Sequence, residues 1–362
     1  MKITDIKIGT LKTPLKTPFK TAVRCVDEMV EVIVKIETDA EVSGWGAAPP
    51  TAKVTGDTVG SIVGAIGDTI RPQLLGANAE ELEDCLARLN DSIKGNTSPK
   101  AAVDIALHDL WARSIGRPAW QLFGGSGKQI KTDVTVSVDT PEKMTADAIA
   151  AKESGFDTIK IKLGIDSEVD LLRLRTIRSA VGDGMKVRID ANQGWTPKEA
   201  VRLLEHIESE GFNIDIVEQP VKAHDLKGMA FVTQRSPFPV VADESCWAPG
   251  DAIRILESGA ADMVNIKLMK CGGIKAARQI VAVADAMGAK AMMGVMLEGR
   301  ISSAAAVHLA SAYDTITRAD IDGPLLSKTD PTKGGPQYDG AVITPNATPG
   351  FGVESVSGIE WL

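Results

Sequence analysis

A pattern that repeats between residues 132 and 322 constrains the fold of this chain more than any other feature. Short segments rich in β-branched residues alternate with stretches of helical periodicity such as DLLRLRTIRSAVG. The spacing is about 24–30 residues, the length of one βα unit. We expect eight strands, at residues 132–138, 157–164, 185–192, 214–220, 239–245, 262–268, 290–295 and 316–322. Eight such units without a GxGxxG motif favour an α/β fold with a closed (β/α)8 barrel over an open dinucleotide-binding sheet.

The first 125 residues have a different pattern, typical of a smaller α+β domain. ITDIKIGTL and EVIVKIET alternate apolar and polar residues, as half-buried strands do. The turn-rich segment VSGWGAAPP is expected to close that small sheet, and helices are expected near 57–71, near 79–90 and from Ser98-Pro99 to Gly116. We therefore divide the chain into an α+β domain at residues 1–125, a barrel at 126–324 and a C-terminal segment at 325–362 that packs back on the first domain.

The composition argues against several classes of protein. Hydrophobic residues make up 44% of the 362 residues, and the formal net charge is −8. These values are typical of a globular protein and argue against a surface for nucleic acid or anionic membrane. The four cysteines include no CxxC pair, so neither a disulfide framework nor a thiolate zinc site is expected. No apolar run reaches the roughly 18 residues of a membrane helix, and MKITDIKIGTLKTP lacks the apolar core of a signal peptide, so we expect a cytoplasmic location.

Three acids stand at the ends of consecutive expected strands: Asp190, Glu218 and Asp243. Barrel enzymes place their chemistry at the C-terminal strand ends. Three carboxylates that converge there would repel one another unless a cation neutralised them. All-oxygen ligands with no Cys or His nearby suit Mg²⁺ or Mn²⁺ better than zinc. The alternative is that each acid only caps a helix or faces solvent.

Lysines end two strands on opposite walls of the expected barrel. Lys162 ends the second strand and Lys267 the sixth, so two ammonium groups face each other across the mouth. A lysine whose pKa is lowered by burial and nearby positive charge can take a proton from a carbon next to a carboxylate, while a cation stabilises the resulting enediolate. Lys160 shares a strand face with Lys162 and is expected to lower its pKa and to stabilise a charged substrate oxygen. In the alternative interpretation these lysines only balance the acids.

These motifs resemble the enolase superfamily, in its muconate-lactonising branch. The shared segments run along the whole chain in the order TPFKTA, GWGAAPP, GNTSPKAAVDIALHDLWAR, KIKLG, RIDANQGW, VEQPV, ADES and NIKLMKCGG. A lysine base working with Mg²⁺ is a pattern known for that superfamily. The resemblance implies that the three acids bind Mg²⁺, that Lys162 and Lys267 are the acid/base pair assisted by Lys160, and that the first domain caps the barrel mouth. Branches with a catalytic histidine are disfavoured, because none of the four histidines ends an expected barrel strand.

The eighth strand distinguishes members of this branch by substrate. Asp320 and Asp322 share one face of ADIDG, and paired acids there would bind a cation, most simply an ammonium group. This resembles the dipeptide epimerases of the family, in which an Asp-x-Asp pair holds the α-ammonium of the dipeptide. Arg24 resembles the arginine by which Ala-Glu epimerases bind glutamate. Thr135 is a candidate for a substrate hydrogen bond, and Glu298 matches an acid often found in the seventh-strand loop.

Together these residues predict a Mg²⁺-dependent enzyme that epimerises the carboxy-terminal residue of a dipeptide. L-Ala-D/L-Glu is the first expected substrate, which implies a role in recycling cell-wall peptides. A cycloisomerase, an o-succinylbenzoate synthase or an N-acylamino-acid racemase on the same scaffold stays open as the second hypothesis. A non-catalytic binding protein is the third, and the full set of acids and lysines argues against it. We expect a homo-oligomer, because barrels of this type commonly assemble.

Overall fold

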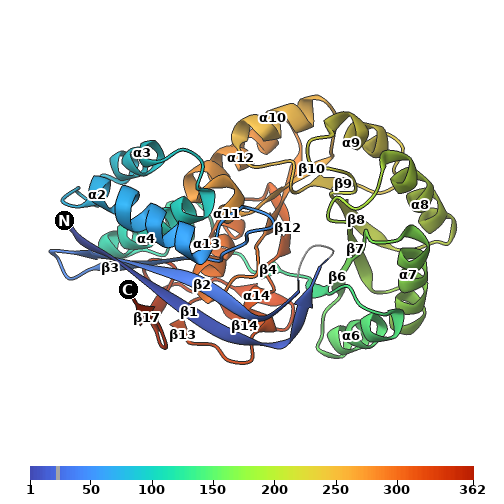
Figure 1. Ribbon diagram of the computed structural model, residues 1–362, viewed down its shortest axis with the longest axis horizontal. Coiled ribbons are helices and arrows are strands. Elements are labelled where there is room, and N and C mark those ends of the chain that lie inside the picture. Colours follow the sequence, from blue (N-terminus) through green and yellow to red (C-terminus); the bar gives the residue numbers. More distant parts are fainter. Residues whose placement is uncertain (22–24) are drawn as a thin grey trace.

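The computed structural model describes residues 1–21 and 25–362. A small antiparallel sheet and the helices packed on it form a cap beside a large barrel (Figure 1). The cap sheet contains β1 (Ile3–Lys20), β2 (Cys25–Thr38) and β3 (Ser43–Ala48), with β17 (Glu360–Trp361) at its other edge. The first two strands extend well past the alternating segments that the sequence marks, because the β1–β2 pairing continues to Lys20 and Cys25.

The segment expected to close this sheet with a turn is instead its third strand. Gly44 and Gly46 of β3 lie against helix α4 (Thr97–Ile115). A Cβ atom added at Gly46 would lie 1.9 Å from the Ala102 carbonyl oxygen, and one at Gly44 would lie 2.1 Å from that of Ala106. These glycines therefore allow the strand to pack closely on the helix. In the sequence, glycines in this role cannot be told apart from glycines in a turn.

Helices cover one side of the cap sheet. They are α1 (Val59–Gly64), the π-helical turn η1 (Ala65–Ile70), α2 (Arg71–Leu74), α3 (Leu82–Ser92), α4 and α5 (Ala119–Leu122). The predicted start of α4 at Ser98 is late, because Asn96 takes a left-handed conformation (φ 49°) and the helix begins at Thr97. Gly116, with φ 72°, ends α4 as predicted.

Eight parallel strands form the barrel, in sequence order around the sheet. They are β5 (Val134–Val136), β6 (Thr158–Lys162), β7 (Lys186–Asp190), β8 (Ile214–Glu218), β9 (Val240–Ala242), β10 (Met263–Ile266), β11 (Lys290–Gly294) and β12 (Ile316–Asp320). A parallel bridge between Thr132 and Ala319 joins the first strand region to the last. All eight strands lie within the predicted segments, and the predicted (β/α)8 barrel is confirmed.

Helices between the strands surround the barrel, as the ribbon shows on its right side (Figure 1). They are α6 (Pro141–Glu153), α7 (Ser167–Val181), α8 (Pro197–Ser209), α9 (Leu226–Thr233), α10 (Pro249–Glu257), α11 (Leu268–Cys271), α12 (Ile274–Ala286) and α13 (Arg300–Ala310), with α14 (Gly323–Leu326) after the last strand. No helix in the described part of the chain is long and apolar enough to cross a membrane.

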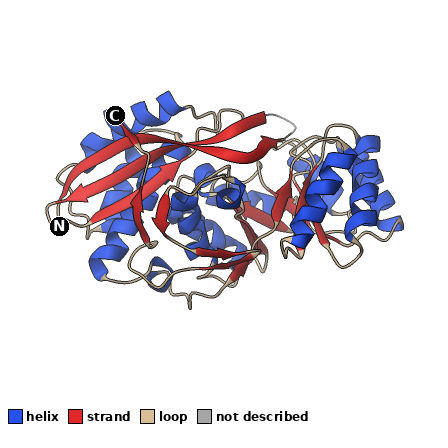
Figure 2. Cartoon of the chain, turned by 90° about the horizontal axis from the view of Figure 1, so that it is seen from below, coloured by secondary structure: helices blue, strands red, loops and turns tan. Residues whose placement is uncertain are grey.

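The C-terminal segment returns to the cap, as predicted (Figure 2). Trp361 of β17 pairs with Gly9 of β1 in antiparallel fashion. The C-terminal segment forms two small sheets before it reaches the cap. In the first, β15 (Val342–Thr344) pairs with β14 (Gln337–Asp339) and with β4 (Ile130–Lys131). In the second, β13 (Thr332–Gly334) pairs with β16 (Val353–Val356). The tail thus completes the cap, while the boundaries at residues 125 and 324 stay predictions.

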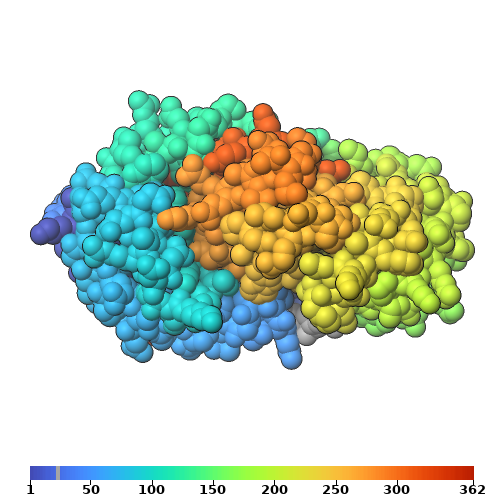
Figure 3. All heavy atoms as spheres, turned by 90° about the horizontal axis from the view of Figure 1, so that it is seen from above, coloured from blue at the N-terminus to red at the C-terminus, as the bar shows by residue number. Residues whose placement is uncertain are grey.

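Polar contacts hold the cap to the mouth of the barrel. Lys20, at the end of β1, forms an ion pair with Asp139 after β5, with 2.6 Å between Nζ and Oδ2. Glu31 of β2 accepts a hydrogen bond of 2.9 Å from the backbone N–H of Gly299, in the loop after β11. In the space-filling view the blue cap meets the orange and yellow barrel residues along a continuous boundary (Figure 3). The cap therefore covers the end of the barrel where strands finish in charged residues.

Candidate active site

The carboxyl ends of the barrel strands and two segments of the cap enclose a cavity of about 330 Å³. The cap contributes Phe19, Thr21, Lys53 and Val54. On the barrel side the cavity is lined by both predicted acid/base lysines and by four predicted site residues, namely Thr135, Asp243, Asp320 and Asp322. The structure therefore brings most of the predicted site residues to one enclosed place between the two parts of the molecule.

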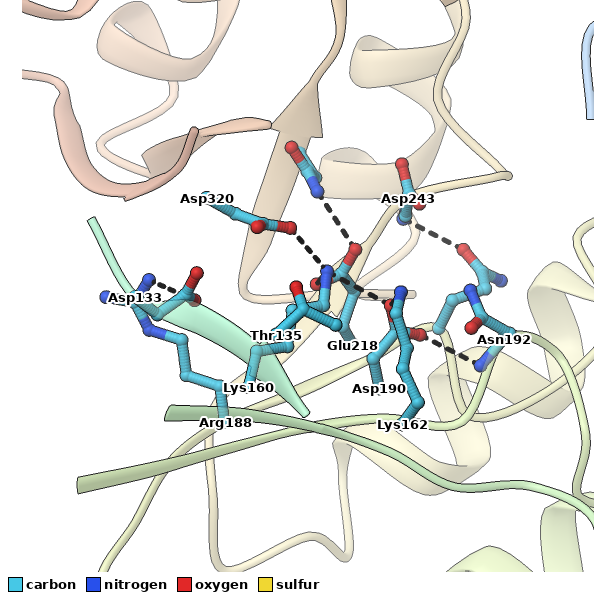
Figure 4. Close-up of polar contacts among 12 residues, drawn as sticks. Asp133, Thr135, Lys160, Lys162, Arg188, Asp190, Asn192, Glu218, Asp243 and Asp320 are labelled. Atoms are coloured by element: carbon cyan, nitrogen blue, oxygen red, sulfur yellow. Dashed lines mark hydrogen bonds and ion pairs between the residues drawn. The ribbon is translucent and has the colours of Figure 1, made fainter. Parts of the chain in front are cut away.

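The three acids predicted to bind a metal lie side by side at this end of the barrel (Figure 4). Asp190 and Glu218 are register partners on β7 and β8, and Asp243 directly follows β9. Each is at most 2% exposed to solvent. Their close placement follows from parallel strand register, which brings equivalent strand ends to one height.

Lysine ammonium groups lie between these carboxylates. The Nζ of Lys162 is 2.6 Å from Asp190 Oδ2, and that of Lys267 is 2.7 Å from Asp243 Oδ2. Lys160 is fully buried, and its Nζ lies 3.0 Å from Asp190, 2.7 Å from Glu218 and 2.7 Å from Asp320. Each buried acid is thus paired with a buried cation, as buried charges require.

The donor set fits a hard divalent cation. In the described part of the chain, no three His, Cys, Asp or Glu side chains are already gathered closely enough to hold a metal. Glu218 Oε2 is nevertheless buried without a hydrogen bond, although Lys160 Nζ lies 2.7 Å away. Glu244 Oε2, beside the site, is buried and unpartnered as well. Carboxylate oxygens, with no thiolate or imidazole among them, are the ligands that Mg²⁺ prefers.

Burial and the close pairs shift the pKa values of these groups. Burial raises the pKa of Asp190, but Lys162 and Lys160 outweigh that effect and hold it at about 2. Burial raises the pKa of Glu218 above its usual range, and the neighbouring Asp190 adds to the rise. Burial lowers the pKa of Lys267, yet the adjacent Asp243 carboxylate raises it above its ordinary value. The lowered lysine pKa expected from the sequence is therefore not found for Lys267 while it is paired with Asp243.

The two acids of the eighth strand are not equivalent. Asp320 Oδ2 accepts a hydrogen bond of 2.7 Å from Lys160, so its charge is already matched. Asp322 Oδ2 accepts one of 2.7 Å from the backbone N–H of Thr135. Burial, together with the negative charge of Asp320, raises the pKa of Asp322 to about 6. Asp322 is thus the acid of the pair with no lysine within ion-pair distance among the described residues, and a bound cation would stabilise its charged form.

Other predicted residues lie differently. Thr135 lines the cavity, but its backbone N–H is taken by Asp322. Glu298 is buried, and its Oε1 accepts a hydrogen bond of 2.7 Å from the N–H of Met296, a residue that does line the cavity. Arg24 lies outside the described residues.

Two residues that support the acids were not found from the sequence. Lys270 is 1% exposed, and its Nζ donates to Asp243 Oδ1 (2.6 Å), to the Asp243 carbonyl and to the Asn265 carbonyl (2.9 Å). Asn265 Nδ2 donates to Glu218 Oε1 at 2.9 Å. The second lysine of NIKLMKCGG was the available sequence feature, because a lysine three residues after Lys267 enters the next turn.

A network of charged side chains also extends below the site, in a part of the barrel interior that is usually apolar. Arg188 of β7 donates to Asp133 Oδ2 at 2.8 Å (Figure 4). It also donates to the Ala319 carbonyl at 2.7 Å. Asp133 faces Asp320, and burial raises its pKa well above the usual range. These contacts hold the end of β12, which carries Asp320, and Asp322 follows two residues later at the start of α14.

Comparison with known proteins places the chain among relatives of known activity. The family model for the mandelate racemase / muconate lactonizing enzyme N-terminal domain matches residues 3–124, and the enolase C-terminal domain-like model matches residues 143–357. The L-Ala-D/L-Glu epimerase of Clostridium acetobutylicum is 49% identical, over 99% of this chain and 100% of that protein.

Solved structures agree with that comparison. A substrate-liganded complex of the L-Ala-D/L-Glu epimerase from Bacillus subtilis superposes with a TM-score of 0.97 at 44% identity, covering 99% of this chain and 100% of that one. The dipeptide epimerase from Enterococcus faecalis, complexed with Mg and L-Leu-L-Tyr, gives a TM-score of 0.94 at 36% identity, covering 98% and 100%.

Proposed function

The chain belongs to the mandelate racemase / muconate lactonizing enzyme family of the enolase superfamily, and on that premise we propose that it is a Mg²⁺-dependent dipeptide epimerase that inverts the carboxy-terminal residue of L-Ala-D/L-Glu. It is an isomerase acting on amino-acid derivatives. The observation that carries the proposal is the pair of lysines, Lys162 on β6 and Lys267 after β10, that line one cavity from strands four apart. An acid at the same cavity, Asp322, supplies the partner that a free amine needs.

The two lysines allow proton transfer on both faces of one carbon. The strands that carry them are on opposite walls of an eight-stranded barrel, so a substrate α-carbon between them presents one face to each Nζ. One lysine in its neutral form takes the α-proton, and the other, as ammonium, returns a proton on the opposite face. Bound by Asp190, Glu218 and Asp243, Mg²⁺ supplies positive charge that stabilises the substrate carboxylate as negative charge develops on it.

Lys160 links the two ends of the substrate site. Its ammonium touches two proposed metal ligands and Asp320, so it fixes their relative positions and neutralises part of their charge. Asp322 is left to bind the α-ammonium of the dipeptide, in a buried place where a charge-assisted hydrogen bond is strong. A substrate without a free amine would leave this carboxylate without its cation, which disfavours the cycloisomerase, synthase and N-acylamino-acid racemase reactions.

Proton exchange in D₂O tests the proposal. The purified protein is incubated with Mg²⁺ and a library of dipeptides, together with succinylbenzoate, muconate and N-acylated amino acids, and one-unit mass gains are measured. We expect deuterium in L-Ala-L-Glu and L-Ala-D-Glu and in a few related dipeptides. Exchange confined to substrates without a free amine, with Mg²⁺ shown to bind by calorimetry, would contradict the dipeptide assignment.

We also propose that the enzyme acts in the cytoplasm, on peptides recycled from the cell wall, and that it assembles as a homo-oligomer. All four cysteines are free thiols, as in proteins of reducing compartments. Trp361 and Leu362 leave apolar surface exposed at the edge of the cap sheet, which suits contact between subunits. Cell fractionation and sedimentation of the purified protein test the two points separately.

A further inference from the structure

Lys53 is a cavity residue that has no ion-pair partner among the described residues. It lies in the cap segment between β3 and α1 and lines the cavity next to Val54. The other two lysines that line the cavity, Lys162 and Lys267, each lie within 2.7 Å of a carboxylate oxygen. Among the described residues, no carboxylate lies within ion-pair distance of Lys53, and its side chain is exposed.

Two charges of a dipeptide match charged groups on the barrel wall of the cavity. The α-carboxylate would bind Mg²⁺ near the lysines of the barrel, and the α-ammonium would bind Asp322. The side chain of the carboxy-terminal residue is left, and the cap supplies the remaining wall of the cavity, with Lys53 as its unpaired cation in the described part of the chain. An unpaired ammonium at a binding cavity attracts an anionic group of the ligand.

We propose that Lys53 binds the side-chain carboxylate of an acidic carboxy-terminal residue, in addition to the contact expected from Arg24, and thereby favours acidic over neutral dipeptides. This inference rests on the proposed epimerase function and adds to it a residue that determines side-chain specificity. The ion pair is partly exposed to solvent, and the lysine side chain must be ordered to form it, so its contribution is small. The effect should appear in substrate binding and not in proton transfer, because Lys53 is separate from the paired lysines that flank the α-carbon.

Two dipeptides that differ only in the charge of the second side chain test the role of Lys53. L-Ala-L-Glu and L-Ala-L-Gln have nearly the same shape, and only the first carries a side-chain carboxylate. We expect Lys53→Gln to raise KM for L-Ala-L-Glu about fivefold, with little change in kcat, and to leave KM for L-Ala-L-Gln within about twofold. Lys53→Glu should raise KM for L-Ala-L-Glu further, by repulsion, and Lys53→Arg should restore it. Added salt should weaken the wild-type preference for glutamate and leave that of Lys53→Gln unchanged.

Lys222→Gln is the control variant. Lys222 is also exposed and without an ion-pair partner among the described residues, and it precedes Ala223 at the cavity, but it does not line the cavity itself. It should leave both KM values unchanged. Equal increases for the glutamate and glutamine dipeptides in Lys53→Gln, or no increase for either, would overturn the inference and leave the epimerase proposal intact. Exchange of neither dipeptide by the wild-type protein would overturn both.

Discussion

The barrel side and the cap side of the cavity differ in how their charges are arranged. On the barrel side every cation meets an acid: Lys160 alone touches three carboxylates and is fully buried. On the cap side, the cavity is lined by Phe19, Val54 and an exposed lysine, Lys53, that has no acid partner in the described chain. Fixed, desolvated charges suit proton transfer, which needs groups held in one geometry. A loop with one open cation suits selection among side chains.

This comparison separates chemistry from specificity within one cavity. Changes on the barrel side should abolish turnover or metal binding, whereas changes on the cap side should alter which dipeptide is preferred. If the two sides were not separate in this way, a change on one side would alter both turnover and dipeptide preference.

Replacing either paired lysine should have the largest effect. Lys162→Ala and Lys267→Ala should each reduce epimerisation by about 10³-fold, because one of the two proton-transfer groups is lost. Each variant should still exchange the α-proton of one enantiomer of the carboxy-terminal residue with D₂O, and the two variants should favour opposite enantiomers. Mass spectrometry of both dipeptide diastereomers measures this. Equal residual exchange of both diastereomers by both variants would contradict the two-base scheme, and Lys222→Ala is the control.

The next largest effect concerns Lys270, which does not line the cavity. It holds Asp243 through the carboxylate and the backbone carbonyl, so it is a positioning residue for a proposed metal ligand. Lys270→Met should weaken Mg²⁺ binding about 10–100-fold, as loss of groups that orient metal ligands does. Titration calorimetry with Mg²⁺ alone measures this without activity. Lys290→Met, at the opposite end of the barrel, should leave the affinity unchanged, and equal affinities in all three proteins would remove the role of Lys270.

The sequence predicts which residues lie together on the barrel side of the cavity, because the ends of neighbouring parallel strands lie at one height. Three of these residues end neighbouring parallel strands: Lys162, Asp190 and Glu218. Lys162 pairs in register with Asp190, and Asp190 with Glu218, so the spacing of the βα units is enough to predict that they lie together. Lys270 and Asn265 were missed, because their partners Asp243 and Glu218 are distant in the chain. The sequence predicts a turn at GWG where the structure has strand β3, because a glycine at a close helix contact and a glycine in a turn give the same sequence signal. Cap loops have no such periodicity, and Lys53 therefore emerged only from the structure.

Asp322 connects the barrel chemistry with substrate recognition. Asp322→Asn keeps the acceptor for the Thr135 N–H and removes the charge. We expect KM for L-Ala-L-Glu to rise about tenfold, because a charge-assisted hydrogen bond to the ammonium is replaced by a neutral one. The affinity for Mg²⁺ should stay within about twofold. Steady-state kinetics and calorimetry measure the two quantities separately, and an unchanged KM would remove the ammonium role.

The smallest expected effect concerns Glu31, which lies where the cap contacts the barrel. It is 3% exposed, and burial raises the pKa of its carboxyl from 4.5 to about 7, opposed by the hydrogen bond from Gly299. An acid whose pKa is raised in the folded state is harder to ionise there than in the unfolded chain. The free energy of unfolding therefore decreases as pH rises from about 4.5 through 7, and below 4.5 the group contributes no pH dependence.

Glu31→Gln should remove that pH dependence at the junction of cap and barrel. Its amide oxygen still accepts from Gly299, but its N–H group needs a partner in a buried place, which offsets much of the gain. We expect a Tm about 2 °C above wild type at pH 8 and no increase at pH 4.5. Scanning calorimetry at the two pH values measures this. A Tm difference that is the same at both would show that Glu31 stays charged in the folded protein, and that the cap is held to the barrel by an ionised contact.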